Sequence, residues 1–494
     1  MKIAELPIYS PEKYKSSNRS RSERRKEINS LRRKKKKLER KLRHISLDID
    51  FENDNTTAFS NFHLVETFKK SIDFNELIRE LFTLEKGSNS SYKANNVLDY
   101  LIDSNALGFS RFEHTEVLRF DPGYKDIKGI DRFPSEKVFR DFFSLFNNDH
   151  IGELCAINRR LIELRSQWQG VKEIWFDIDS TTITLFGKQE HGEKRYNARY
   201  RGRLSFELMV CFINETKDLL YIEICPTGST PKAEFKNFLS KCKQLVPANY
   251  VLKGLRIDKG FFSETNLNYL EGEYLAYVAK VPLYTNIRHY VEKIPENHWK
   301  EVNEYTTVTR KKLLLDKWEH DRFIDIRRIK IEQKTGQMLL PDAYCYRYEA
   351  IVSSEIENSP ESNLNWYDGR GCAEDLIKEL KDGFAVDEAS QHQLTRNTAY
   401  AFVKAISYNL FQFFKSVAMP ESHQSWQIQT VRRKIINIPG NILGRGIRNR
   451  RVKIAPREYL KLLLPLIQQK LEHFLYFVAN NFRHVELKYL LLLS

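Results

Sequence analysis

Two aspartates stand at the ends of apolar segments that are predicted to be buried strands. Asp179 closes the segment VKEIWFDID, and Asp258 closes VLKGLRID before a turn that Gly260 permits. If both strands belong to one sheet, their carboxylates meet at one edge of it. A buried carboxylate is costly unless it is paired or metal-bound, and Mg²⁺ prefers oxygen ligands of this kind. Two unrelated turn aspartates remain the alternative at this point.

Asp177 lies two residues before Asp179 in the same predicted strand. Residues two apart in a strand point to the same face. Asp177 could therefore bind metal beside Asp179 or replace it. Either residue taken alone could equally cap a loop or form a salt bridge.

A third acidic residue lies in a segment with helical spacing. Tyr367, Arg370, Glu374 and Lys381 follow one another at intervals of three, four and seven. At about 3.6 residues per turn these intervals keep all four on one stripe of a helix. A Tyr, an Arg and a Lys around a Glu would suit phosphate binding beside a metal-bound carboxylate. An exposed charged helix is the alternative.

The elements that must position these residues follow from hydrophobic periodicity. Apolar residues recur at three and four over 51–165, which predicts a helical module, and 19–45 reads as a basic helix. From about residue 171, strand-like segments alternate with helical ones and predict a mixed α/β sheet. Residues 283–355 alternate apolar and polar side chains and predict a β-rich insertion, after which the chain returns to helices.

The basic residues are unevenly placed. The chain has 494 residues and a net charge of +15, and residues 19–43 hold 14 basic and 3 acidic side chains, a net +11. A second basic stretch runs over 432–453 with eight Lys and Arg and no acidic residue. Such clusters predict a polyanion partner, because neutralising each phosphate releases counterions. The residues expected to contact DNA in the second stretch are Arg432, Arg433, Lys434, Arg445, Arg448, Arg450 and Arg451.

Other functional classes lack support in the sequence. The six cysteines are scattered without a CxxC pair, so neither a disulfide framework nor a zinc site is indicated. There is no HExxH motif among the 12 histidines. No apolar segment reaches the roughly 18–20 residues that span a bilayer, and the N-terminus has no apolar signal core. These features predict a protein of the cytoplasm without a membrane partner.

The spacing of Tyr367, Arg370, Glu374 and Lys381 resembles the Y-R-E-K signature of DDE transposases of the insertion-sequence-four superfamily. Upstream, "FDIDSTT" around Asp179 is similar to the family's first catalytic aspartate motif, and "LRIDKGFF" is similar to the second. The resemblance therefore implies a DNA transposase with Asp179, Asp258 and Glu374 as its catalytic triad.

More narrowly, residues 60–415 resemble the insertion-sequence-thirteen-eighty group. The order of "DIDSTTITLFGKQE", the pair Tyr196–Asn197, "RIDKGFF" and "YDGRGCAEDLIKELK" carries this likeness. Two departures stand out: Lys259 follows the second aspartate where a small residue is more usual, and Ser229 replaces part of a common Gly-Asn pair. Lys259 could touch the substrate or perturb the metal site.

The resemblance implies an α/β fold with a ribonuclease-H-like mixed-sheet catalytic core and a β-rich insertion, flanked by helical N- and C-terminal regions. The 115 residues between Asp258 and Glu374 leave room for that insertion. Within it, Trp299 or Trp318 would stack on a flipped DNA base, although a partly buried structural Trp is the plainer interpretation of each. The expected domains are a basic arm (1–50), a helical DNA-binding domain (51–168), a core (169–282 and 356–418), the insertion (283–355) and a helical C-terminal region (419–494).

The implied chemistry uses two Mg²⁺ ions, for which Mn²⁺ can substitute, held by the triad, with Asp177 as a further candidate ligand. Arg370 and Lys381 would grip phosphates, and Tyr367 would bind a phosphate or pack on a sugar. The expected partners are terminal inverted repeats, flanking DNA and target DNA, with a homodimer pairing two ends near a bacterial nucleoid. A non-catalytic DNA-binding descendant, or another nuclease on the same core, is the alternative.

Overall fold

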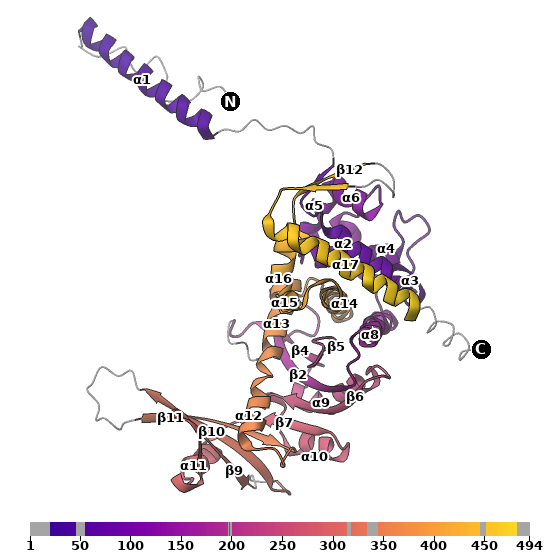
Figure 1. Cartoon of the computed structure of the whole chain (residues 1–494), viewed down its shortest axis with the longest axis vertical. Helices are drawn as coiled ribbons and strands as arrows, with labels where there is room; N and C mark the ends of the chain where they lie inside the picture. Colours follow the sequence, from indigo (N-terminus) through magenta and orange to yellow (C-terminus); the bar gives the residue numbers. More distant parts are fainter. Residues whose placement is uncertain are drawn as a thin grey trace. The chain divides into compact units, whose positions relative to one another are not determined.

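The computed structural model describes residues 20–45, 55–195, 197, 200–313, 318–332, 344–444 and 451–481 (Figure 1). The chain divides into two compact units, residues 1–54 and 55–494. The first unit contains α1 (Arg21–Ile45), the predicted basic helix. None of the side chains at residues 21–40 of α1 is buried.

The second unit begins with a block of helices, as the periodicity of residues 51–165 predicts. Local signals set several boundaries: Asn147 caps α8 through the backbone N–H of His150, and Gly108 ends α4 in a left-handed conformation. The elements are β1 (Thr56–Thr57), α2 (Phe62–Ser71), α3 (Phe74–Leu81), α4 (Ala94–Leu107), η4 (Phe112–Thr115), α5 (Glu116–Phe120), α6 (Pro122–Lys128), α7 (Glu136–Phe143) and α8 (Asn148–Gln169).

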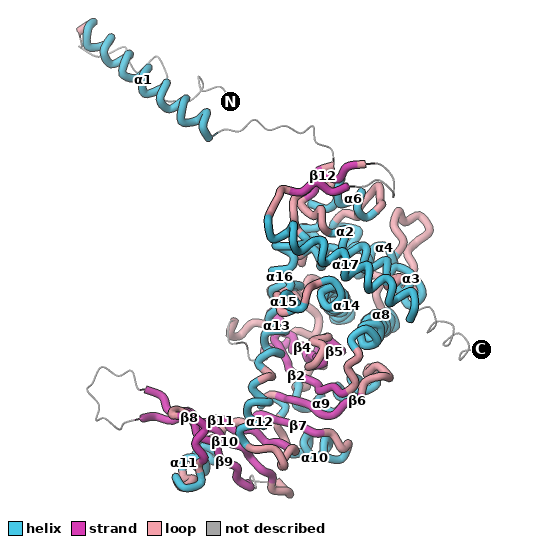
Figure 2. The backbone as a smooth tube through the Cα atoms, in the orientation of Figure 1, coloured by secondary structure: helices cyan, strands magenta, loops and turns pink. Residues whose placement is uncertain are grey.

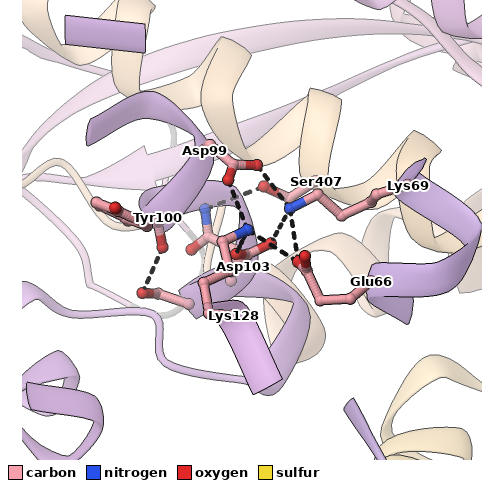
Figure 3. A network of polar contacts seen from close by, with 9 residues as sticks. Glu66, Lys69, Asp99, Tyr100, Asp103, Lys128 and Ser407 are labelled. Atoms are coloured by element: carbon pink, nitrogen blue, oxygen red, sulfur yellow. Dashed lines mark hydrogen bonds and ion pairs between the residues drawn. The ribbon is translucent and has the colours of Figure 1, made fainter. Parts of the chain in front are cut away.

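A buried network of charges joins α2, α4 and α6 inside this block (Figure 3). The ammonium of Lys69 contacts Glu66 at 3.1 Å, Asp99 at 2.6 Å and also Asp103. Lys128 contacts the same three carboxylates at 2.5 to 2.8 Å. Three acids therefore share two bases, which leaves one carboxylate in excess. Burial raises the pKa of Asp103 to about 6, whereas at Asp99 the two ammonium groups outweigh burial and lower the pKa to about 2.

The sheet that follows has the strand order of a ribonuclease-H-like core. Its centre runs β5–β4–β2–β6–β7, with β2 antiparallel to β4, β4 antiparallel to β5, and β2, β6 and β7 parallel. A three-stranded meander is thus followed by two strands that return through helices, as a parallel connection requires. The elements are β2 (Glu173–Thr184), β3 (Glu193–Lys194), β4 (Leu204–Ile213), β5 (Leu219–Ile224), α9 (Pro231–Gln244), β6 (Val251–Ile257), η5 (Lys259–Phe261), α10 (Glu264–Gly272) and β7 (Ala276–Lys280).

The β-rich segment does not form a separate sheet. Its last strand, β11, pairs antiparallel with β7, with Ile351 opposite Lys280, so the core sheet continues through β11, β10, β9 and β8. Sequence periodicity predicts the strands themselves but not this junction. The elements are α11 (Thr285–Glu292), η6 (Glu296–His298), β8 (Lys300–Asn303), β9 (Thr306–Leu313), β10 (Arg322–Glu332) and β11 (Tyr344–Ser353).

The chain then returns to helices, and α14 forms their centre (Figure 2). It is buried over most of its length and packs against α4, α8, α17 and β5. Two strands in this region, β12 and β13, are not predicted by the periodicity; β12 pairs with β1 at the start of the unit. The elements are α12 (Pro360–Asp368), α13 (Gly371–Phe384), α14 (Leu394–Ala418), α15 (Glu421–Gln424), α16 (Ile428–Val431), the π-helical turn η7 (Arg432–Ile436), β12 (Gly440–Leu443), β13 (Arg451–Ile454) and α17 (Glu458–Asn481).

None of the helices in the described part of the chain is long and apolar enough to cross a membrane.

Candidate active site

The sheet brings Asp179 and Asp258 to one edge. β2 and β6 are parallel neighbours with Ile178 opposite Ile257, so the residues that follow lie side by side. Asp179 has a side chain only 15% exposed, and Asp258 is half-buried at the start of η5. Asp258 follows the end of β6 as predicted, but Asp179 does not end its strand, because β2 continues to Thr184; the register still sets the two aspartates side by side.

Arg370 connects this edge to Glu374. Its Nη2 lies 2.6 Å from Asp179 Oδ2, and its Nη1 lies 3.4 Å from Glu374 Oε1. The guanidinium is 3% exposed, whereas the side chain of Glu374, in the first turn of α13, is 72% exposed. α13 packs against β2, which places Glu374 near the aspartates although 115 residues separate it from Asp258.

The electrostatics of Asp179 reflect its burial and the two other acids nearby. Burial raises the pKa of Asp179 to about 6, and the carboxylates of Asp258 and Glu374 add to the rise. Arg370 and the backbone N–H of Ser180, 2.8 Å from the carboxylate, oppose it. A site with this excess of negative charge favours the binding of a cation.

The donor set fits a hard divalent cation, because all three acids offer oxygen. Across the described ranges, no three His, Cys, Asp or Glu side chains are close enough together to form a coordination shell. Here the positive charge among the acids is Arg370, which contacts Asp179 and Glu374. The exposed Glu374 carboxylate is the donor freest to turn toward a bound ion.

Tyr367 belongs to a different helix from Glu374, so the predicted stripe is interrupted. It lies in the last turn of α12, and Arg370 stands at the break before α13. The Tyr367 ring is buried against Val278 and Leu364, with Lys280 Nζ 5.2 Å from its centroid. Burial raises the pKa of its hydroxyl, which therefore stays protonated and can donate a hydrogen bond.

The break between the helices requires glycine at position 369. A Cβ on Gly369 would lie 2.8 Å from Nη1 of Arg256, a buried residue of β6. That guanidinium also donates to the backbone carbonyl of Trp366 at 2.9 Å. Gly369 therefore lets the end of α12 close onto the core sheet.

Arg256 also decides the position of Asp177. Its Nε and Nη2 each lie 2.7 Å from one carboxylate oxygen of Asp177, and both side chains are 1% exposed. A bidentate pair of this kind satisfies the carboxylate within the protein. The possible role of Asp177 as a metal ligand is thus corrected: the residue is a buried structural partner of Arg256.

The basic residues of the second stretch separate into two groups. Arg433 and Lys434 on η7 and Arg451 on β13 are exposed, as DNA contact requires. Arg445, Arg448 and Arg450 lie outside the described residues.

Arg432 contradicts the prediction. Its side chain is 2% exposed, and it donates to the backbone carbonyls of Asn105, Ala106 and Gly383. A phosphate at the surface cannot reach it, and its role is internal.

The other predicted contacts lie at different depths. Lys259 is exposed directly after Asp258, and Lys381 is half-buried on α13. Trp299 and Trp318 are partly buried against the core, and each indole faces a guanidinium: Arg328 at 4.4 Å from Trp299 and Arg322 at 5.1 Å from Trp318. These contacts favour the plainer structural interpretation of both rings.

A basic cavity beside the start of α12 was not predicted from the sequence. It has a volume of about 230 Å³ and is lined by His298, Lys300, Arg310 and Lys311 together with the first residues of α12. Arg310 is held by Asp325 and by two backbone carbonyls, whereas Lys311 donates to Nδ1 of His298 at 2.6 Å. In the sequence, the only indication of this cavity is the run of basic residues in the alternating β9 segment.

The strand order and the acidic residues at its carboxyl edge define a nuclease core of the ribonuclease-H-like class. The chain belongs to the DDE transposase family: the family described as Transposase DDE domain group 1 matches residues 40–474. The protein is therefore a DNA transposase and an enzyme of the DDE type, a class that depends on divalent metal ions.

Among solved structures, the chain is similar to the piggyBac transposase synaptic complex with hairpin DNA, determined by cryo-EM. The two share 11% identity over 84% of each chain, with a TM-score of 0.39. No curated protein sequence matches the chain.

Proposed function

We propose that the protein cuts DNA at the ends of a mobile element and joins those ends to target DNA, using Asp179, Asp258 and Glu374. The observation that carries the proposal is the pairing of β2 with β6, which sets two aspartates side by side, with Arg370 bridging from there to Glu374. The Y-R-E-K spacing supports assignment to the insertion-sequence-four superfamily, and the flanking motifs favour the insertion-sequence-thirteen-eighty group.

Two Mg²⁺ ions, replaceable by Mn²⁺, would be held by these three carboxylates. When bound, they supply an activated water or 3′-hydroxyl and stabilise the leaving oxygen at phosphorus. Arg370 keeps positive charge within the acidic cluster and orients Asp179 and Glu374. To grip a phosphate with its planar fork, the buried guanidinium would have to leave Asp179. Tyr367 and Lys280 form the wall beside it.

DNA would be bound by cations beside this edge and elsewhere on the second unit. Lys259 adjoins the catalytic aspartate, and Lys381 lies farther along α13. Arg433, Lys434 and Arg451 would contact terminal-repeat or flanking DNA, as would Arg445, Arg448 and Arg450 from the sequence pattern. The cavity lined by Lys300 and Lys311 would bind a backbone phosphate. Stacking of Trp299 or Trp318 on a flipped base would first require the facing guanidinium to move.

The expected domain roles form part of the proposal. Residues 1–50 and the helical block over 51–168 would bind DNA, the core would comprise 169–282 and 356–418, and 283–355 would be the insertion. Residues 419–494 would form the helical C-terminal region. A homodimer would pair two element ends, since the reaction needs both.

Glu374→Gln tests the proposal with the least structural disturbance, because this carboxylate is exposed and Gln keeps its size. We expect nicking at the element end to disappear under Mg²⁺ while binding to the same duplex persists. Wild-type nicking in the variant would remove Glu374 from the triad. The duplex should come from the inverted repeats that flank the coding region. Joining to a target plasmid distinguishes a transposase from another nuclease, and wild-type binding without any cleavage would indicate a non-catalytic descendant.

A further inference from the structure

Arg432 joins the ends of two helices that belong to different parts of the second unit. Its Nε and Nη2 donate to Ala106 and Asn105 in the last turn of α4, at 2.8 and 2.6 Å. Its Nη1 donates to Gly383 in the last turn of α13, at 2.7 Å. The carbonyls at a helix C-terminus lack partners within the helix and carry partial negative charge. One buried guanidinium therefore caps both helices.

Aromatic side chains hold the guanidinium in place. Its centre lies 4.7 Å from the ring of Phe384 and 5.6 Å from the ring of Phe411, on α13 and α14. Nearly complete burial makes the charge costly and lowers the pKa of Arg432 to about 9. A costly charge kept at a junction of helices suggests a role beyond filling space.

The residues after Arg432 extend the contact with the helical block. η7 is a π-helical turn, a form that occurs frequently at functional sites. Asn437 donates to the carbonyl of Leu107 at 3.0 Å, so three successive carbonyls at the end of α4 are bound by this segment. Ser60 and Asn61, before α2, donate to Ile438 and Ile435. We call residues 432–438 the junction segment.

A second buried basic side chain caps the same end of α13. Lys404 of α14 is fully buried, and its terminal amino group donates to the carbonyl of Ala385, the left-handed residue that ends α13. Glu379, one turn earlier, accepts a hydrogen bond from the backbone N–H of Ile428 at 2.5 Å. The C-terminal half of α13 is thus tied to α14 and to the approach to the junction segment.

Glu374 lies at the opposite end of the same helix. Nine residues separate it from Gly383, about 14 Å along a helix axis. A helix is stiff over this length, so its anchored end sets the position of its first turn. The exposed Arg433 and Lys434 stand on the same π-helical turn as Arg432.

We infer that the junction segment couples a DNA-contacting surface to the active site, and that Arg432 is a positioning residue that sets where α13 presents Glu374. Arg433 and Lys434 face outward to phosphate, while Arg432 faces inward to α4 and α13. DNA bound to the outer face thereby acts on the element that carries the third acid. This inference rests on the proposed function, in which Glu374 acts on DNA.

The test compares Arg432→Lys with a matched variant, Arg165→Lys. Arg165 is also buried, but it pairs with Asp218, directly before β5, rather than with the end of α13. Lys keeps the charge at position 432 but cannot reach carbonyls in three directions. Single-turnover nicking at saturating element-end duplex should fall by at least about tenfold in Arg432→Lys, since a small misplacement of a reacting group suffices for that. The Kd for the duplex should stay unchanged.

Hydrogen exchange gives a readout that does not depend on activity. In Arg432→Lys, amides of residues 371–384 should exchange faster, whereas in Arg165→Lys they should exchange as in the wild type. Equal exchange of α13 in the two variants would overturn the inference, as would a rate loss in Arg432→Lys that parallels its loss of folded protein. A wild-type enzyme that nicks no duplex would contradict the proposed function alone, because the exchange comparison still reports on α13.

Discussion

The guanidinium of Arg370 lies 2.6 Å from the carboxylate of Asp179, and it is almost completely buried. A residue that binds phosphate is expected at the surface, yet Arg370 is buried close to the acids of the site. The Nη1 atom of the same guanidinium lies 3.4 Å from Oε1 of Glu374. The geometry supports a role for Arg370 in holding Asp179 and Glu374 in place.

We therefore expect Arg370→Lys to lower the cleavage rate without weakening DNA binding. Lys keeps the charge but loses the planar fork that spans two carboxylates, so single-turnover nicking should fall by about 10²-fold through misplacement. Lys259→Gln is the matched contrast, because Lys259 is exposed. It should weaken affinity and reduce its salt dependence by about one phosphate contact. Equal losses of affinity in both variants would argue against an internal role for Arg370.

The first unit should contribute affinity but not stability. α1 buries none of its described side chains at 21–40 and belongs to a unit separate from residues 55–494. Deleting residues 1–45 should flatten the plot of log Kd against log salt concentration, because its cations release counterions from DNA. The Tm of the remainder should stay within error of the full chain. An unchanged salt slope would show that the basic helix does not touch phosphate.

Much of the catalytic arrangement can be predicted from sequence because it depends on local rules. Two apolar segments that each lead into an Asp predicted the approach of Asp179 to Asp258, which the pairing of Ile178 with Ile257 confirms, although β2 continues past Asp179 to Thr184. The spacing of Arg370 and Glu374 likewise follows from one turn of helix.

Burial is where prediction from sequence failed. Arg432 and Arg433 are neighbours of the same type in one basic stretch, yet one is 2% exposed and the other is on the surface. What separates them is that Arg432 reaches the ends of both α4 and α13, whose residues Ala106 and Gly383 are more than 250 positions apart. Asp177 shows the same limit, since its partner Arg256 is on another strand. The pairing of β11 with β7 is also long-range.

In the buried network of the helical block, the stability contributed by two aspartates should depend on pH in opposite directions. The lowered pKa of Asp99 means that its ionised form stabilises the fold above about pH 4, and that this stability is lost as pH falls toward 2. Asp99→Asn should therefore lower the free energy of unfolding at pH 7 by about 2–3 kcal/mol.

The stability contributed by Asp103 depends on pH with the opposite sign. Its raised pKa means that the folded state binds more protons between about pH 4 and 6, so its contribution to stability falls as pH rises through that window. Asp103→Asn resembles the protonated acid and should cost less at pH 7 than Asp99→Asn. Urea unfolding at pH 5 and pH 7 measures both. A larger cost at Asp103 would reverse this assignment.

The basic cavity beside α12 should bind a phosphate of the DNA backbone. Lys300 and Lys311 line it, and Glu361 is the one acidic residue among the described residues of its lining. Replacing both by Gln should reduce the slope of log Kd against log salt by about two contacts and leave the nicking rate at saturating DNA unchanged. Glu361→Gln should have the reverse effect and tighten binding. Unaltered affinity in both the double Lys variant and Glu361→Gln would exclude a phosphate from this cavity.

Lys404 should give the protein a stability that rises with pH. Burial lowers the pKa of its ammonium to about 7, although Glu388 and Asp387 act in the opposite direction. Between about pH 7 and 10.5 the unfolded chain then binds more protons than the folded one, so the free energy of unfolding increases with pH by up to about 1.4 kcal/mol per unit. Lys404→Met should remove that slope between pH 7.5 and 9.5 in urea titrations, since Met fills the space without a charge. Lys378→Met, on the exposed face of α13, is the control that keeps the slope. If Lys404→Met and the wild type show the same pH dependence, Lys404 is charged in the fold throughout this range, and the end of α13 is held by a permanent cation.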